Sequence, residues 1–167
     1  PTNDRRQRQM CIRDSNYTTY IYRNCNFAFN GIPGYSWLLD GNNIKATNCV
    51  FNNNTLIEIS LSSSIDFTFN NCVFANNTLA EGLFSQKQNI NTTNCIFYAN
   101  TSDYTSLFSS CVIVVATNCT FSENVSISGN EVINSNSSYF SLRNSIIDAS
   151  NISASGTLDD IFNNLLF

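Results

Sequence analysis

The stretch Asn71-Cys72-Val73-Phe74-Ala75-Asn76-Asn77 is one copy of a string that recurs along this chain of 167 residues. The shared pattern is Asn-Cys-x-Phe, with a further Asn three residues after the Phe. From one Cys to the next the spacing is 24, 23, 23 and 24 residues, and a weaker sixth copy with Ser145 in place of Cys follows after 26. Such a period is typical of a solenoid. The repeat therefore favours an ordered rod over the disorder that an Asn- and Ser-rich composition also allows.

Each copy follows a run in which apolar residues alternate with polar ones, as do Phe67 and Phe69 ahead of Asn71. This period of two is typical of a strand with one buried face. At the repeated Asn the buried phase slips by one residue, which predicts a bend, and Asn tolerates the left-handed backbone that a tight bend needs. A third apolar pair, such as Leu83-Phe84, predicts a third short strand. Three short strands in 23–24 residues predict one rung of a parallel β-helix.

We therefore predict an all-β, right-handed parallel β-helix of about six rungs over residues 16–155. Stacked rungs would align the repeated residues in three columns. The Phe column holds Phe27, Phe51, Phe74, Phe97 and Phe121. The Cys column holds Cys25, Cys49, Cys72, Cys95 and Cys119. The Asn column, expected to hydrogen-bond from rung to rung as an asparagine ladder, holds Asn24, Asn48, Asn71, Asn94, Asn118 and Asn144.

The two ends of the chain lack this pattern. Residues 1–15 are basic and non-repeating, and we interpret them either as an arm or as a remnant of cloning or sequence assembly. Residues 156–167 are predicted to form a partial rung or an end cap. Since a solenoid needs covered ends, we expect further repeats or a capping domain at the C-terminus.

Composition narrows the function. The formal net charge is −4 and only 12% of residues are charged, while 28 Asn, 22 Ser and 14 Thr supply the polarity. Scarce basic residues argue against a nucleic-acid partner, and the short apolar runs argue against membrane insertion. The sequence has no His, which removes imidazole catalysis and His-liganded metal. It has no Cys-x-x-Cys pair either, so we predict no metal and no cofactor.

The five column cysteines are predicted to be free, buried thiols. Parallel side chains that point the same way make the disulfide dihedral hard to reach, whereas free Cys behaves as a small apolar residue. Cys11 and Cys111 lie outside the column and are the expected exceptions.

Three carboxylates are the weak candidates for catalysis, because they recur at similar places in the repeat. Glu58 and Glu81 lie nine residues after their Cys, and Asp103 lies eight after its own. Stacking would place neighbours about 5 Å apart, a spacing that glycosidases use. Glu58 stands between Ile57 and Ile59, however, and is expected to point to solvent. A solvated acidic edge is therefore the default interpretation, and a polysaccharide lyase or hydrolase is the alternative.

An ice-binding surface is a second alternative, since two columns of threonine recur in the repeat. Flat arrays of Thr-x-Thr would be needed, but Asn70 interrupts one column and neither is paired in that way. The columns are Thr47, Thr93 and Thr117, and Thr55, Thr78 and Thr101. Nine Asn-x-Ser/Thr sequons also occur. If the protein is secreted by a eukaryote, Asn53 and Asn76 are the most accessible candidates for glycosylation, because they lie in the turn after the Phe. The sequon at Asn118 is expected to be blocked by the ladder.

The Phe-x-x-Asn repeat, preceded by Asn-Cys, resembles that of the polymorphic outer-membrane proteins and related adhesin-like proteins, in the pectin-lyase-like β-helix superfamily. The resemblance covers residues 20–150 and implies an extracellular or surface-displayed rod without catalytic activity, used as an adhesin or a structural stalk. The outward columns, rich in Asn, Ser, Thr and Tyr, suit the binding of glycans or surface proteins. The matching pairs are Phe27 with Asn30, Phe51 with Asn54, Phe74 with Asn77, Phe97 with Asn100, and Phe121 with Asn124.

Overall fold

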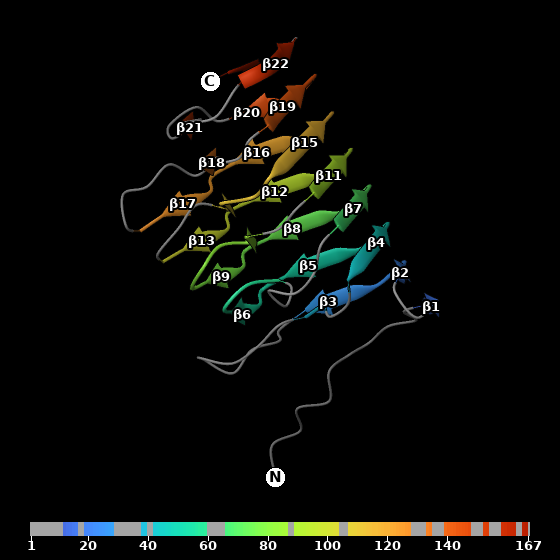
Figure 1. Ribbon diagram of the computed structural model, residues 1–167. Helices are drawn as coiled ribbons and strands as arrows, with labels where there is room; N and C mark the ends of the chain where they lie inside the picture. Colours follow the sequence, from blue (N-terminus) through green and yellow to red (C-terminus); the bar gives the residue numbers. More distant parts are fainter. Residues whose placement is uncertain are drawn as a thin grey trace.

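The computed structural model describes residues 12–16, 19–28, 38–39, 42–59, 66–86, 89–103, 107–127, 133–134, 139–147, 152–153, 158–162 and 165–166. These residues form strands and the bends between them, and the strands stack along one axis as a parallel β-solenoid (Figure 1). No helix with the length and hydrophobicity of a membrane span occurs in this part of the chain.

Five-residue strands build the first long sheet, which has the order β1-β2-β4-β7-β11-β15-β19-β22. β1 pairs antiparallel with β2, and every later pairing in the sheet is parallel. The strands are β1 (Ile12–Asn16), β2 (Thr19–Arg23), β4 (Asn43–Thr47), β7 (Asp66–Asn70), β11 (Asn89–Thr93), β15 (Ile113–Thr117), β19 (Tyr139–Arg143) and β22 (Leu158–Phe162).

A second long sheet follows the first around each corner and has seven parallel strands. They are β3 (Asn26–Ala28), β5 (Val50–Asn52), β8 (Val73–Ala75), β12 (Ile96–Tyr98), β16 (Thr120–Ser122), β20 (Ile146–Ile147) and β23 (Leu165–Leu166).

Two four-stranded sheets complete the turns. One holds β6 (Thr55–Leu56), β9 (Thr78–Leu79), β13 (Thr101–Ser102) and β17 (Val125–Ser126). The other holds β10 (Phe84–Ser85), β14 (Phe108–Ser109), β18 (Ile133–Asn134) and β21 (Ile152–Ser153). The predicted parallel β-helix is thus confirmed. Its rung count differs slightly from six, and a full rung has four strands where the sequence predicted three, because a two-residue strand is too short to show a period.

The repeated Asn turns the chain between the two long sheets. Its φ lies between 48° and 54° in all six copies, in the left-handed region where Asn costs little. Burial alternates on both sides of it with the predicted slip: Phe67 and Phe69 are buried before Asn71, and Cys72 and Phe74 after it.

The amides of this Asn column form the predicted ladder, here called the outer ladder because its members are exposed at the corner. Each Nδ2 donates to the Oδ1 of the preceding rung at 3.1–3.3 Å. The donors are Asn48, Asn71, Asn94 and Asn118.

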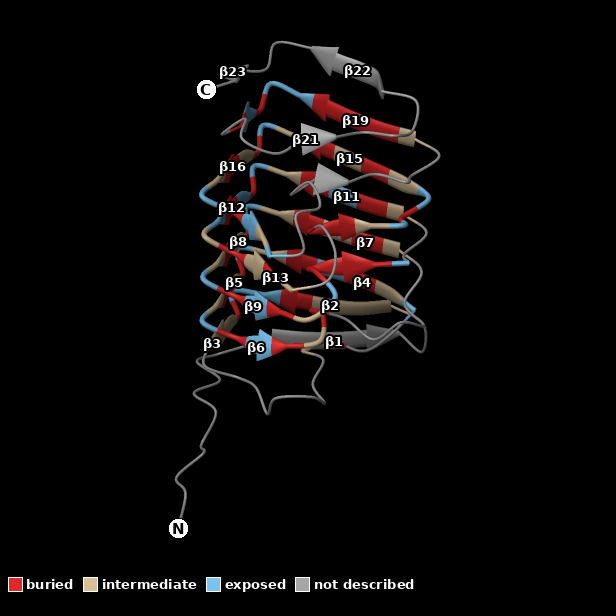
Figure 2. Cartoon of the chain, turned by 90° about the vertical axis from the view of Figure 1, so that its left-hand side faces the viewer, coloured by how far each residue is buried: buried red, intermediate tan, exposed pale blue. Residues whose placement is uncertain are grey.

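Figure 2 shows in red the buried residues of the strands. Phenylalanine side chains make up much of this buried core. The rings of the Phe column, from Phe27 to Phe121, are stacked nearly parallel, with centroids 4.7–5.0 Å apart and interplanar angles of 3–4°. Phe69 and Phe84 pack edge-on against Phe74, at 5.1 Å and 5.8 Å. The stacking distance matches the spacing of hydrogen-bonded strands, so one rung carries one ring of the stack.

A second, buried asparagine ladder, here called the inner ladder, consists of Asn54, Asn77, Asn100 and Asn124. The Nδ2 of Asn54, Asn77 and Asn100 donates to the Oδ1 of the following rung at 2.8–3.0 Å. In all four members Nδ2 also donates to the carbonyl of a Phe in the preceding rung at 2.8–2.9 Å. The Oδ1 atoms of Asn77, Asn100 and Asn124 each accept a second hydrogen bond, from the backbone N–H of the ladder Asn in the preceding rung. These Asn residues close the Phe-x-x-Asn motif of the sequence, but the motif by itself does not predict their hydrogen bonds.

Cys49, Cys72, Cys95 and Cys119 are free and buried, whereas Cys25 is disulfide-bonded. The prediction of five free column thiols is therefore wrong at the first rung. Cys111 is also free, so it is not the expected exception, and Cys11 lies outside the described residues.

The free thiols of the Cys column hydrogen-bond to backbone carbonyl groups at the bend. Each donates at 3.3 Å to the carbonyl two residues earlier, just before the left-handed Asn. Ser145 replaces Cys in the sixth copy without loss of this bond, because its hydroxyl donates to the Arg143 carbonyl at 2.9 Å.

The thiols also alter one another's ionisation. The hydrogen bond with Cys49, together with burial, raises the pKa of Cys72 to about 12. The bond with Cys119 acts to lower the pKa of Cys95, but Cys72 and burial raise it to about 12. Cys95 and burial raise the pKa of Cys119 as well. At the opposite end, the hydrogen bond with Cys72 lowers the pKa of Cys49 to about 7.

Candidate binding face

The structure separates the three candidate carboxylates. Glu58 is only 3% exposed, and its Oε2 accepts the Ser85 backbone N–H at 3.2 Å. The expectation that Glu58 points to solvent is therefore wrong. Strand β6 ends at Leu56, and the strand alternation on which that expectation rested does not continue through residues 57–59.

Glu81 lies one rung beyond, since its N–H donates to the Ile57 carbonyl at 2.9 Å, yet its side chain is exposed. Asp103 is half-buried, and its N–H donates to the Leu79 carbonyl. This bond places Asp103 one residue out of register with Glu81. Shared register thus places Glu58 and Glu81 on neighbouring rungs but does not put both carboxyl groups into one site.

The predicted glycosylation sites Asn53 and Asn76 are exposed, and both have left-handed backbone. Asn118 is exposed too, but its Nδ2 is engaged with Asn94 at 3.2 Å. Of the Thr columns, Thr55 and Thr78 are exposed in β6 and β9, and the other members are half-buried.

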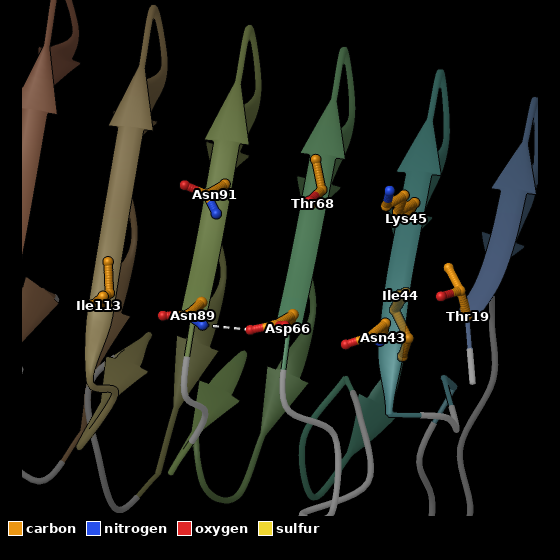
Figure 3. Close-up of a pocket in the computed structure, with 9 residues that line it drawn as sticks. All are labelled: Thr19, Asn43, Ile44, Lys45, Asp66, Thr68, Asn89, Asn91 and Ile113. Atoms are coloured by element: carbon orange, nitrogen blue, oxygen red, sulfur yellow. Dashed lines mark hydrogen bonds between the residues drawn. The ribbon is translucent and has the colours of Figure 1, made fainter.

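A groove of about 480 Å³ lies on the outward face of the first long sheet (Figure 3). Its volume falls within the range of small-molecule and ligand sites. The residues that line it come from the starts and middles of five consecutive strands: Thr19, Asn43, Ile44, Lys45, Asp66, Thr68, Asn89, Asn91 and Ile113.

Asp66 is the centre of the first row of this groove. Parallel register places Asn43 and Asn89 on either side of it, one rung away in each direction. Asn89 Nδ2 donates to Asp66 Oδ1. With its amide turned to satisfy both groups, Asn43 Nδ2 donates to Asp66 Oδ2 and to the Asn42 carbonyl, both at 3.2 Å. Amides from two neighbouring rungs therefore hold the carboxylate in place. We call Asn43, Asp66 and Asn89 the acceptor row.

A second row runs beside the first, two residues further along the same strands. It consists of Lys45, Thr68 and Asn91, which are in register with one another. Lys45 and Asn91 are exposed and Thr68 is half-buried. We call these residues the donor row, because an ammonium, a hydroxyl and an amide all carry N–H or O–H groups.

The residues of the groove are suited to binding a polar ligand and not to holding a metal ion. Among the described residues no group of three or more His, Cys, Asp or Glu is placed to hold a metal ion. No family model, curated protein or solved structure matches the chain.

Proposed function

We propose that this chain is a non-enzymatic, adhesin-like β-solenoid that binds an extracellular ligand on its groove face. The observation that carries the proposal is the Asp66 carboxylate, held by amides of the rungs on both sides. A polar group that is already fixed loses little freedom when a ligand docks, so its hydrogen bonds contribute more of their energy to affinity.

The resemblance of the repeat to the polymorphic outer-membrane proteins, within the pectin-lyase-like superfamily, supports a place at the cell surface or outside the cell. The extended, polar face of a solenoid also suits glycans and surface proteins, which are the partners that we propose. The fold alone does not determine the function, so the choice between binding and catalysis depends on the residues of the groove.

Those residues favour binding over turnover. Hydrolysis of a glycosidic bond commonly uses two carboxyl groups on either side of it. Asp66 is the one carboxylate among the nine described residues that line the groove. Glu58 is buried and Glu81 is exposed, so these two carboxyl groups do not share a surface.

A combined binding and cleavage assay tests the proposal. The purified chain is incubated with a panel of polysaccharides and with whole cells, and bound protein and new reducing ends are both measured. We expect binding without new reducing ends. Cleavage that disappears in Glu58→Gln or Glu81→Gln would establish the enzyme instead, and the absence of binding to every polysaccharide and to cells would overturn the proposal.

A further inference from the structure

We infer that the groove binds a neutral, hydroxyl-rich polysaccharide that lies across the strands, an inference that rests on the proposed binding function of the same face. It names the class of ligand and the rows that would recognise it. Three properties of the rows carry it: the direction of their amides, their balance of charge and their spacing.

The acceptor row presents oxygen atoms to a ligand. Both Nδ2 hydrogens of Asn43 are engaged by Asp66 and the Asn42 carbonyl, and Asn89 Nδ2 also turns toward Asp66. Figure 3 shows the amide oxygen of Asn89 on the side away from Asp66. With the Asn43 amide turned to donate to Asp66, its oxygen also faces away, on the opposite side of the carboxylate. A carboxylate oxygen has further lone pairs beyond the bond it already accepts. A ligand on this row must bring donors.

The donor row needs the complementary groups. Lys45 has donors and no acceptor, and Asn91 and Thr68 can each donate as well as accept. A ligand that spans both rows therefore needs groups that donate on one side and accept on the other. A hydroxyl group does both, and a sugar carries several of them on one ring.

Charge separates neutral glycans from the alternatives. Among the nine described residues that line the groove, Asp66 and Lys45 are the charged ones, and their formal charges cancel. A polyanion would be attracted by Lys45 but repelled by Asp66 on the neighbouring rung. A polycation would be attracted by Asp66 but repelled by Lys45. The groove therefore offers no net attraction to either.

Spacing sets the direction of the chain. Within each row, neighbouring members are one rung apart, about 4.8 Å, and the two rows are two residues apart, about 6.6 Å along the strand. The rows run along the solenoid axis, so a linear ligand contacts successive rungs only when it lies along that axis, across β4, β7 and β11. An unbranched glycan presents its hydroxyl groups repeatedly in that manner.

Affinity electrophoresis and calorimetry with four probes test the ligand class: a neutral β-glucan, a mannan, polygalacturonate and chitosan. We expect the wild-type chain to bind a neutral probe, with an affinity that changes less than twofold between about 0.05 M and about 0.5 M salt, because neutral ligands escape ionic screening.

Thr68→Val, which removes one hydroxyl from a half-buried strand position, should weaken binding about fivefold. Asp66→Asn should weaken it at least tenfold, since it removes the charged acceptor. The control variant is Thr78→Val, an exposed strand position outside the groove, which should bind like the wild type.

The outcomes separate this inference from the proposed function. Binding confined to polygalacturonate or chitosan, and lost at high salt, overturns the neutral-glycan inference and leaves the binding function standing. Binding to cells alone, with no affinity for the four probes, does the same. Binding to a neutral probe that survives both Asp66→Asn and Thr68→Val places the site elsewhere on the rod and overturns the inference. Circular dichroism of each variant shows that it is folded.

Discussion

Replacement of Asn100 by Ala tests the inner ladder, a row of buried and hydrogen-bonded amides inside the solenoid. Asn100 is fully buried, and its side chain takes part in four hydrogen bonds. Its Nδ2 donates to the Phe74 carbonyl at 2.9 Å and to Asn124 Oδ1 at 3.0 Å. Its Oδ1 accepts from Nδ2 and the backbone N–H of Asn77, at 2.8 Å and 3.2 Å.

The magnitude follows from the groups that remain. In the Asn100→Ala variant, the Asn77 N–H and one of its amide hydrogens lose these acceptors inside the protein. A buried donor without its partner costs about 1–3 kcal/mol. We therefore expect the free energy of unfolding to fall by about 2–6 kcal/mol, a large part of the 5–15 kcal/mol that is ordinary for a domain.

Asn100→Asp separates the hydrogen bonds from the loss of volume. The variant keeps an oxygen opposite Asn77, but it places a carboxylate oxygen where Nδ2 faced the Phe74 carbonyl and Asn124 Oδ1. Burial and these acceptors favour the protonated form and raise the pKa of the introduced carboxyl in the folded chain. The folded form therefore binds the proton more tightly than the unfolded chain. The free energy of unfolding of this variant should be higher near pH 4 than at pH 7, because the stabilisation disappears as the pH rises through the raised pKa.

Urea unfolding followed by far-ultraviolet circular dichroism measures these changes. The control is Asn94→Gly in the outer ladder, where the amide is exposed and Gly adopts the φ of 53° without strain. Its expected cost is below about 1 kcal/mol, because water replaces the lost hydrogen bonds. Equal costs for Asn100→Ala and Asn94→Gly would refute the argument that burial makes the inner ladder the more important one.

Three further predictions concern the core, a bend and the thiols. Phe74→Ala should lower the free energy of unfolding by about 3–5 kcal/mol, because its ring is stacked between two others, and a loss below about 1 kcal/mol in urea unfolding would contradict this. Ala99→Gly should raise the melting temperature by relieving a φ of 50°, a gain of about 1 kcal/mol, and an unchanged temperature would mean that no strain is stored there. Stability should fall as pH rises above 9, since Cys72 and Cys95 ionise near 9 when unfolded but near 12 when folded, at about 2 kcal/mol for each thiol by pH 10.5. Urea midpoints of Cys95→Ala across this range should show a shallower slope, and a slope identical to that of the wild type would exclude the thiols as its cause.

The Asn-Cys-x-Phe string was sufficient to predict the solenoid, the outer ladder and the side of the strand that each residue faces. Periodic residues recur at one place in every rung, and stacking is the only way for such a rung to bury its apolar side. Glu58 shows where this reasoning fails. Alternation predicts orientation only within a strand, and the chain bends after Leu56, so Glu58 turns inward.

The sequence also carries a signal for the inner ladder. The left-handed position just before it holds Asn53, Asn76, Ala99 and Glu123 in turn, whereas the next position is Asn in every copy. A position that varies between rungs beside one that does not indicates that the constant residue is buried and hydrogen-bonded. The acceptor row also has a fixed place, since Asn43, Asp66 and Asn89 lie five residues before the outer-ladder Asn. Nothing in that offset, however, reveals that two amides turn toward one carboxylate, because the contact depends on register between rungs.

The two ladders point in opposite directions, and this links stability to the binding face. Outer-ladder amides donate to the preceding rung and inner-ladder amides to the following one, so their dipoles oppose each other along the rod. Both ladders hold the same rungs in register, and the groove depends on that register. Asn77 belongs to the rung that carries Asp66, so Asn77→Ala should reduce both the free energy of unfolding and the affinity for a neutral glycan. Thr78→Val, one residue further along, should reduce neither. Full affinity in a folded but destabilised Asn77→Ala variant would show that the acceptor row keeps its geometry without the ladder behind it.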